Sequence, residues 1–286
     1  MREPDEGHDA DMPESIEPVF VPTSLGLIAV HVLGAGRPTV LWHSMFVDGS
    51  SWGFLLPALL PGRRLLVVDG PGYGRSDRLR RTVRVSDSVT VAAEVLSALA
   101  PGIPVDWIGN AWGGHVGMEL AATRPDLVRS LVAISSPTQP IGPELRRQIK
   151  LLIPIMTVLG PVPPVRNAIL EGLLTDESRT DPQAVGVVID ALALAGRRST
   201  ARTVRSFILN RVDITDLLPR IEAPALFVAG DDRGDWTPEE AESAAALAPF
   251  ARAAVVPGSR TLVPVEQPAA LATLIREFWA SWERPG

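Results

Sequence analysis

The sequence predicts an α/β fold in which a mostly parallel central sheet is flanked by helices and carries a helical insertion. Three observations predict it. Short apolar runs of strand length alternate along the chain with longer segments of helical periodicity. The alternation stops at Pro137 and resumes after Val212, with only helix-like segments between them. Glycine-rich turns directly follow two of the apolar runs, as is typical where a buried strand meets a sharp turn.

In the first part of the chain, strand-like runs alternate with two helix-like segments. The run 64–69, RLLVVD, has a continuous apolar centre and is followed by Gly-Pro-Gly, which is typical of a strand buried on both faces. We expect strands at residues 27–33, 39–42, 64–69, 105–109 and 130–135. We expect helices at residues 86–100, with Ser86 as the cap, and at 112–123.

The interruption reads as four helices. They cover residues 144–159, with a kink at Pro154, residues 165–174, a segment that begins at Pro182, and a segment that begins at a Ser199 cap. Strand and helix then alternate again at residues 225–230, 238–247, 252–256 and 268–282. We therefore expect a disordered acidic tail at 1–17, a core domain formed by 18–136 and 213–286, and a helical cap at 137–212 over the carboxyl edge of the sheet.

Composition excludes several classes of function. The formal net charge of −6 does not favour a nucleic-acid partner or a cationic membrane anchor. The absence of cysteine excludes disulfides, thiolate metal sites and a cysteine nucleophile. No apolar run approaches the ~20 residues of a membrane span, and the polar N-terminus does not resemble a secretory signal. We expect a soluble cytoplasmic protein, a monomer or homodimer, with no cofactor or metal.

Residues 105–114, VDWIGNAWGG, combine a strand, a glycine-rich turn and an immediate helix. This segment resembles the nucleophile elbow of the α/β-hydrolase superfamily, G-x-Nuc-x-G, with Gly109 and Gly113 at the framing positions. The resemblance implies an α/β-hydrolase fold. The position that should carry Ser, Asp or Cys is occupied by Ala111.

Four further segments are similar to landmarks of that superfamily in the same order. They are LWHSM at 41–45, similar to the oxyanion segment with Ser44 in place of glycine; DGPGYGRSD at 69–77; LFVAGDDRGDWTP at 226–238, with Asp232 or Asp235 as the candidate acid; and GSRTLVPVEQP at 258–268, with Thr261 at the histidine position. Together with the elbow they extend the resemblance over roughly residues 20–284.

The catalytic triad implied by the resemblance is degenerate. The four histidines are His8, His31, His43 and His115, so none can come from the late loop that supplies the base. An alanine methyl group cannot attack a carbonyl carbon, which closes the covalent route. The resemblance still implies an oxyanion hole built from the backbone N–H groups of Trp112 and Met45. One such donor can contribute roughly 3–4 kcal/mol to a transition state.

The other candidate site residues each have an ordinary structural explanation. His43, Ser44, Asp48 and Ser136 are candidates for substrate binding, although a buried turn or a cap explains each of them as well. Trp112 fits a pocket wall and core packing equally. For Asp232 and Asp235, and for the Thr261 hydroxyl, a loop position is the simpler interpretation. Apolar stripes in the predicted cap imply an apolar or carbonyl-containing small-molecule ligand.

Three hypotheses for function remain open. The first is a non-covalent enzyme, such as a lyase, isomerase or cyclase, that polarises a carbonyl of a small to medium apolar compound. The second is a catalytically inactive binding protein or sensor, a pseudoenzyme that keeps the pocket. The third and weaker one is a hydrolase with a relocated constellation, using Ser44 or a water activated by Asp232 or Asp235.

Overall fold

The structure, a computed structural model, describes residues 17–232 and 234–282. Except for Glu17, the predicted acidic tail lies outside the described residues. Glu17 itself forms an ion pair with Arg75, at 2.9 Å between its Oε2 and the Nη2 atom. None of the helices in the described part of the chain combines the length and apolar character needed to span a membrane.

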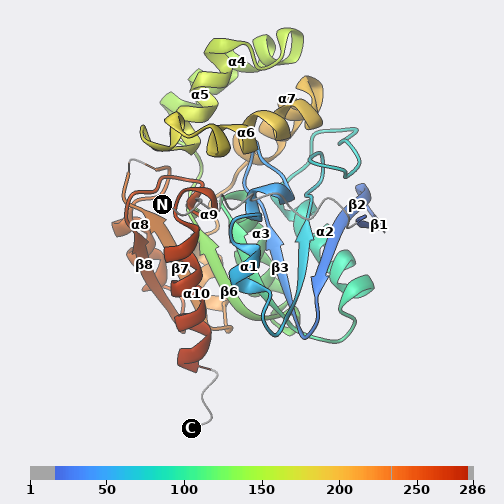
Figure 1. Ribbon diagram of the computed structural model, residues 1–286, viewed down its shortest axis with the longest axis vertical. Coiled ribbons are helices and arrows are strands. Elements are labelled where there is room, and N and C mark those ends of the chain that lie inside the picture. Colours follow the sequence, from blue (N-terminus) through green and yellow to red (C-terminus); the bar gives the residue numbers. More distant parts are fainter. Residues whose placement is uncertain (1–16, 233, 283–286) are drawn as a thin grey trace, which may run out of the picture.

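An eight-stranded sheet forms the centre of the molecule, in the order β1-β2-β4-β3-β5-β6-β7-β8 (Figure 1). The strands are β1 (Val19–Thr23), β2 (Gly26–Gly34), β3 (Arg37–Trp42), β4 (Arg63–Val68), β5 (Val105–Asn110), β6 (Val128–Ile134), β7 (Ala225–Gly230) and β8 (Ala251–Val256). From β4 to β8 all neighbours pair in parallel, while β1 and β2 form an antiparallel hairpin at one edge. The prediction of a mostly parallel sheet is confirmed.

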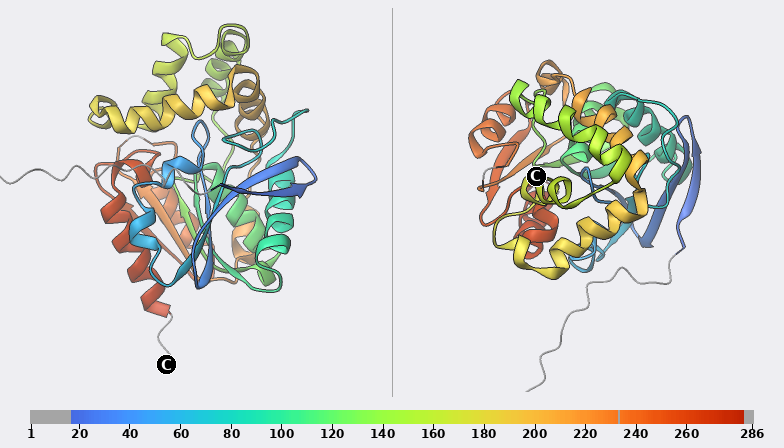
Figure 2. Two further views of the ribbon diagram at one scale, coloured as in Figure 1. Left: turned by 45° about the vertical axis from the view of Figure 1, so that its right-hand side comes forward. Right: turned by 90° about the horizontal axis from the view of Figure 1, so that it is seen from above.

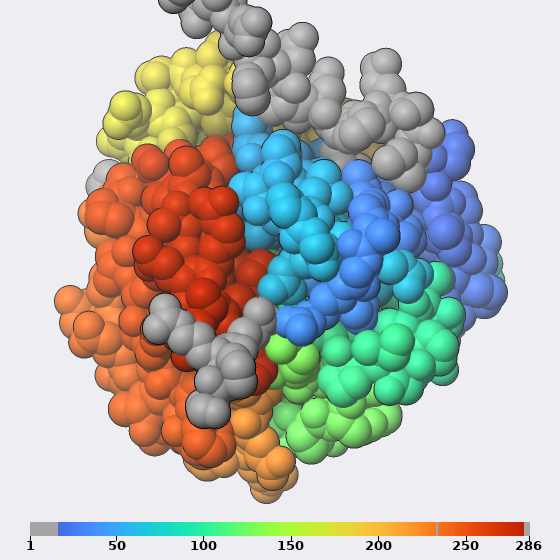
Figure 3. All heavy atoms as spheres, turned by 60° about the horizontal axis from the view of Figure 1, so that its bottom comes forward, coloured from blue at the N-terminus to red at the C-terminus, as the bar shows by residue number. Residues whose placement is uncertain are grey.

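Helices cover both faces of the sheet. The core helices are α1 (Leu56–Leu59), α2 (Val85–Leu99), α3 (Trp112–Thr123), α8 (Pro238–Ala245), α9 (Val263–Glu266) and α10 (Pro268–Trp282). Buried residues of α2, α3 and α8 belong to one hydrophobic cluster, and those of α1 and α10 belong to a second one on the other face. In Figure 3, α10 (red) lies beside the light-blue segment that contains α1.

A layer of helices lies across one end of the sheet, as both views of Figure 2 show. It consists of α4 (Pro143–Leu159), α5 (Pro163–Leu173), α6 (Pro182–Ala195), α7 (Arg197–Thr203) and the π-helix η4 (Val204–Leu209). The four predicted helices of the insertion are all present, and α4 continues through Pro154. The secondary structure of residues 137–212 is thus helices joined by loops, as expected, and their division from the core as a separate cap domain stays a prediction.

Two predicted helix caps were wrong. Helix α2 begins after Arg84, whose backbone N–H donates to the carboxylate of Asp87, so Ser86 lies inside the first turn. Helix α7 begins after Gly196, so Ser199 lies inside the helix, and its hydroxyl donates to the carbonyl of Gly72. Strand β1 was not expected, since it is a short edge strand with several exposed side chains.

Candidate functional site

Ala111 keeps the backbone conformation of the elbow between β5 and α3. Its φ of 47° and ψ of −105° lie outside the regions that an alanine ordinarily adopts. The framing glycines are sterically required. A Cβ at Gly113 would lie 2.0 Å from the carbonyl oxygen of Trp42, and one at Gly109 would lie 2.2 Å from the carbonyl carbon of Gly113. The sequence therefore builds the strained turn but places only a methyl group at its tip.

The two predicted oxyanion donors lie on the wall of a cavity next to the elbow. Met45 and Trp112 both line it, together with Ala111. Within the described residues, neither backbone N–H donates a hydrogen bond to a protein group. Because α3 begins at Trp112, its N–H is one of the donors that a helix leaves unsatisfied at its first turn. Both N–H groups thus lack a protein acceptor, as the donors of an oxyanion hole do before a ligand binds.

Ser44 adds a hydroxyl group to this part of the cavity wall. The family pattern has glycine at this position, and here the side chain is buried with 1% of the residue exposed. Its Oγ atom has no hydrogen-bond partner. A buried hydroxyl without a partner is costly, so it is a candidate donor to a bound ligand.

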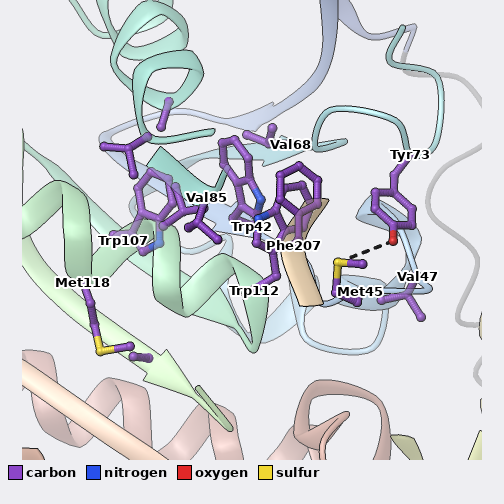
Figure 4. Close-up of a cluster of buried hydrophobic side chains, with 14 of the residues drawn as sticks. Trp42, Met45, Val47, Val68, Tyr73, Val85, Trp107, Trp112, Met118 and Phe207 are labelled. Carbon is purple, nitrogen blue, oxygen red and sulfur yellow. Dashed lines mark hydrogen bonds between the residues drawn. The ribbon is translucent and has the colours of Figure 1, made fainter. Parts of the chain in front are cut away.

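Aromatic side chains hold Trp112 and the loop after β3 that carries Ser44 and Met45, the oxyanion loop, in place (Figure 4). The Trp112 ring stacks on Phe207 of the π-helix, with centroids 4.3 Å apart, and meets Trp42 edge to face at 5.6 Å. The hydroxyl of Tyr73 contacts the sulfur of Met45 at 3.5 Å and the hydroxyl of Thr203 at 2.8 Å. The only tyrosine of the chain thereby joins the oxyanion loop to the end of α7. Nothing in the sequence around Tyr73 indicated this link.

His43 lies beneath the oxyanion loop. The backbone N–H of Gly70 donates to its Nε2 at 2.9 Å, so the ring proton is on Nδ1, which lies 2.6 Å from the carbonyl oxygen of Ser44. Burial lowers the pKa of His43 to about 4, which keeps the ring neutral. Both ring nitrogens are engaged with the backbone. The histidine therefore positions the loop that carries Ser44 and Met45.

Thr261 occupies the position of the missing base and lines the cavity. Its hydroxyl donates to the carbonyl of Gly172 in α5 at 3.0 Å, and its backbone N–H donates to the carbonyl of Leu173. Its own carbonyl accepts a hydrogen bond from Asn110 at 2.8 Å. Thr261 therefore connects the core to the helical layer. Its side chain offers no general base near Ala111 in place of the missing histidine.

Each of the two candidate acids forms an ion pair with an arginine. Asp232 pairs with Arg260 at 2.7 Å and is not on the cavity wall. Asp235 does line the cavity, and its carboxylate accepts a hydrogen bond from Arg211 at 2.8 Å. Each carboxylate is thus paired with an arginine and not with the histidine that the acid of a catalytic triad orients.

Two polar residues of the site were not assigned to it from the sequence. His115, which was expected to pack away from the pocket, lines it one helical turn beyond Ala111, and its ring nitrogens face the carbonyls of Ala111 and Pro137. Burial, and then the charge of Arg211, lower the pKa of His115 to about 3. Arg211 also lines the cavity, although nothing in its local sequence distinguishes it from the other arginines.

Three residues predicted to bind substrate do not line the cavity. Besides His43, Asp48 caps a short helical turn by accepting from the backbone N–H of Ser50, and the hydroxyl of Ser136 donates to the carbonyl of Ile134. All three side chains form hydrogen bonds with backbone groups of the protein. Ligand contact by these three residues stays a prediction, whereas Ser44, Met45, Ala111, Trp112, Asp235 and Thr261 are brought together on the cavity wall.

The cavity itself has a volume of about 610 Å³ and lies between the elbow and the helical layer. Its wall is mainly apolar, and α4, α5 and the π-helix contribute side chains that include Leu152, Ile153, Met156, Ile169 and Phe207. This size suits a small to medium organic molecule.

The family assignment follows from the whole chain. A model of the alpha/beta hydrolase family matches residues 39–274, so the chain belongs to this family. A pimeloyl-[acyl-carrier protein] methyl ester esterase of Yersinia enterocolitica serotype O:8 is 24% identical over 258 residues, covering 84% of this chain and 92% of that protein. A protein of the same name from Photobacterium profundum is 36% identical over 103 residues, and the match spans only 38% of its length.

Solved structures of low sequence identity share the fold. A thermophilic esterase from Thermogutta terrifontis superposes with a TM-score of 0.83 at 24% identity, covering 93% of this chain and 98% of that one. An enol-lactonase from Burkholderia xenovorans LB400 superposes with a TM-score of 0.83 at 18% identity, covering 92% and 100%. At these identities the similarity establishes the α/β-hydrolase fold alone.

Proposed function

We propose that this α/β-hydrolase family protein is a non-covalent enzyme that polarises a carbonyl group of a small to medium apolar compound. One observation carries the proposal. Met45 and Trp112 line the cavity and their backbone N–H groups donate to no protein group within the described residues, while the nucleophile and base positions hold Ala111 and Thr261. Electrostatic stabilisation of a developing oxyanion thus survives where covalent catalysis does not.

The proposed chemistry is a lyase, isomerase or cyclase step through an enolate or related oxyanion. Backbone donors hold the oxygen, the Ser44 hydroxyl adds a further donor, and the apolar wall excludes water, which strengthens each of these interactions. The named relatives are methyl ester esterases, and an ester carbonyl is the kind of group that such donors bind. In the proposed reaction the protein binds a carbonyl group in the same way but forms no covalent acyl-enzyme intermediate.

Hydrolysis through a relocated constellation has less support. Ser44 lies in the oxyanion loop, but its Oγ atom has no hydrogen-bond partner and so no base to activate it. Asp232 is held by Arg260 away from the cavity, and Asp235 is held by Arg211. Neither carboxylate is arranged as a general base for water.

Native and denaturing mass spectrometry tests the proposal. The purified protein is incubated with a metabolite extract of the organism that encodes it, and captured compounds are compared with those returned. We expect a carbonyl compound to be captured non-covalently and returned with altered mass. Ile153→Trp, which fills the cavity, should abolish capture. The control Leu151→Trp, on the same helix but 68% exposed, should not.

Each other outcome has a defined meaning. Capture and release of an unchanged compound contradicts the enzymatic part of the proposal and favours a binding protein or sensor. A covalent adduct on the protein, seen under denaturing conditions, contradicts the non-covalent mechanism. Equal capture by the Ile153→Trp variant places the ligand outside this cavity.

A further inference from the structure

Arg211 is placed to recognise an anionic group on the ligand. It follows the π-helix, and among the described residues on the cavity wall it is the only Arg or Lys. Its side chain is 10% exposed. A guanidinium at this depth needs hydrogen-bond partners for its donors, since it cannot lose its charge.

The protein supplies only part of those partners. Within the described residues, Asp235 is the only hydrogen-bond partner of the Arg211 side chain, through Nη1. The Nε atom is buried and has no partner. In the planar guanidinium, Nε–H and one N–H of Nη2 form a single edge whose spacing matches the two oxygens of a carboxylate. That edge is the one left over after Asp235 has bound to the opposite side.

We propose, building on the function proposed above, that the ligand is an apolar carboxylic acid or oxo acid whose carboxylate binds the Nε–Nη2 edge of Arg211. The apolar part of the ligand then lies among side chains of α4 and α5, such as Leu152, Ile153 and Ile169, which line the same cavity. A bidentate guanidinium–carboxylate pair fixes the orientation of the ligand, which an apolar wall alone does not.

Two acidic residues on the cavity wall oppose a bound carboxylate. Glu171 and Asp235 are both exposed residues, and the Asp235 side chain is 43% exposed, so water screens their charges. Asp235 also shares Arg211 with the ligand. Removing its charge should therefore tighten carboxylate binding, which is the reverse of what loss of Arg211 does.

Isothermal titration calorimetry with two probes of equal chain length tests the inference. Decanoate carries the carboxylate, and 2-decanone carries a carbonyl without charge. We expect the wild type to bind decanoate at least tenfold more tightly than 2-decanone. Arg211→Gln should weaken decanoate binding about tenfold or more and change 2-decanone binding less than twofold, and Arg211→Lys should be intermediate because it keeps the charge without the fork.

Matched variants separate recognition from general effects. Arg205→Gln removes an exposed charge from the same segment, away from the cavity wall, and should bind both probes as the wild type does. Asp235→Asn should tighten decanoate binding severalfold. If Arg211→Gln binds decanoate as well as the wild type does, or loses both probes equally, Arg211 is not a carboxylate site, although the cavity remains a ligand site. If the wild type binds neither probe, the proposed function itself is contradicted, and this inference with it.

Discussion

Ala111 retains the strain of a nucleophile elbow without the nucleophile. A non-glycine residue at a φ of 47° and a ψ of −105° costs about 1–3 kcal/mol. The surrounding backbone imposes this conformation: the N–H of Ala111 donates to Ile134 at 2.7 Å, and its carbonyl accepts from Gly114 and His115. The strain therefore belongs to the turn rather than to the side chain.

Replacing Ala111 with glycine should stabilise the protein. Glycine adopts positive φ without steric cost, which relieves the strain, while its greater freedom in the unfolded chain offsets part of the gain. We expect the free energy of unfolding of Ala111→Gly to rise by about 1 kcal/mol, as measured by urea denaturation. Ala122→Gly, in regular helix α3, is the control and should lose about 1 kcal/mol. A loss of stability in both variants would mean that position 111 is not strained.

The site could be predicted from sequence where it depends on local backbone. Gly109, Ala111 and Gly113 identify the elbow because a strand, a turn and a helix follow one another within ten residues. The arginine partners of Asp232 and Asp235 could not be predicted. They join residues 24 or more positions apart through side chains of irregular loops, and such pairings leave no periodicity.

At the scale of elements, α5 is tied to the loop that carries Thr261. Buried Arg260 donates to the carbonyl of Glu171 and pairs with Asp232, and the N–H groups of Thr261 and Leu262 both donate to the carbonyl of Leu173. In addition, Glu266 accepts from the backbone N–H groups of Thr175 and Arg260, each at 2.7 Å. This network sets the position of α5, and hence one wall of the cavity.

Arg260→Met should loosen this attachment. The side chain of Arg260 is 4% exposed, and removing one partner of a largely buried ion pair is costly, so we expect a loss of about 2–4 kcal/mol in the free energy of unfolding. Amide exchange at Thr261 and Leu262 should become faster than in the wild type. Arg276→Met, on the surface of α10, is the control and should change neither quantity. Unchanged exchange at both amides would show that backbone bonds alone hold α5.

The order of elements was predictable because apolar periodicity is a local property of the sequence. Strand β7 and helix α10 begin and end where their apolar periodicity does, because both pack along their whole length. The π-helix Val204–Leu209 was expected as ordinary helix, since π-helical turns are rare and mostly occur as single turns within α-helices. Phe207 of this π-helix stacks on Trp112, a contact between residues far apart in the sequence that the local pattern does not encode.

At the scale of the whole molecule, buried titratable groups oppose one another in the pH dependence of stability. Burial lowers the pKa of His43 to about 4 and of His115 to about 3, so their contribution to stability is present above about pH 6.5 and is lost as the pH falls below it. Burial, and then the nearby Asp48, raise the pKa of Asp69 to about 7. Because its pKa is higher in the folded state, its contribution is present below about pH 4 and is lost as the pH rises through 7.

The two histidines outweigh the single carboxyl group, so the wild type should gain on the order of 2 kcal/mol in unfolding free energy between pH 4.5 and 6.5. Asp69→Asn removes the opposing contribution. Its overall stability should fall, because the amide side chain replaces a carboxylate that accepts from the N–H groups of Gly49 and Arg75, but its gain over the same pH interval should be larger by about 2 kcal/mol. Urea denaturation followed by tryptophan fluorescence at four pH values between 4.5 and 7.5 measures both curves, with Asp190→Asn, an exposed carboxyl on α6, as the control. Parallel curves for the wild type and Asp69→Asn would show that Asp69 is ionised throughout this range, so that Gly49 and Arg75 donate to a fully charged carboxylate.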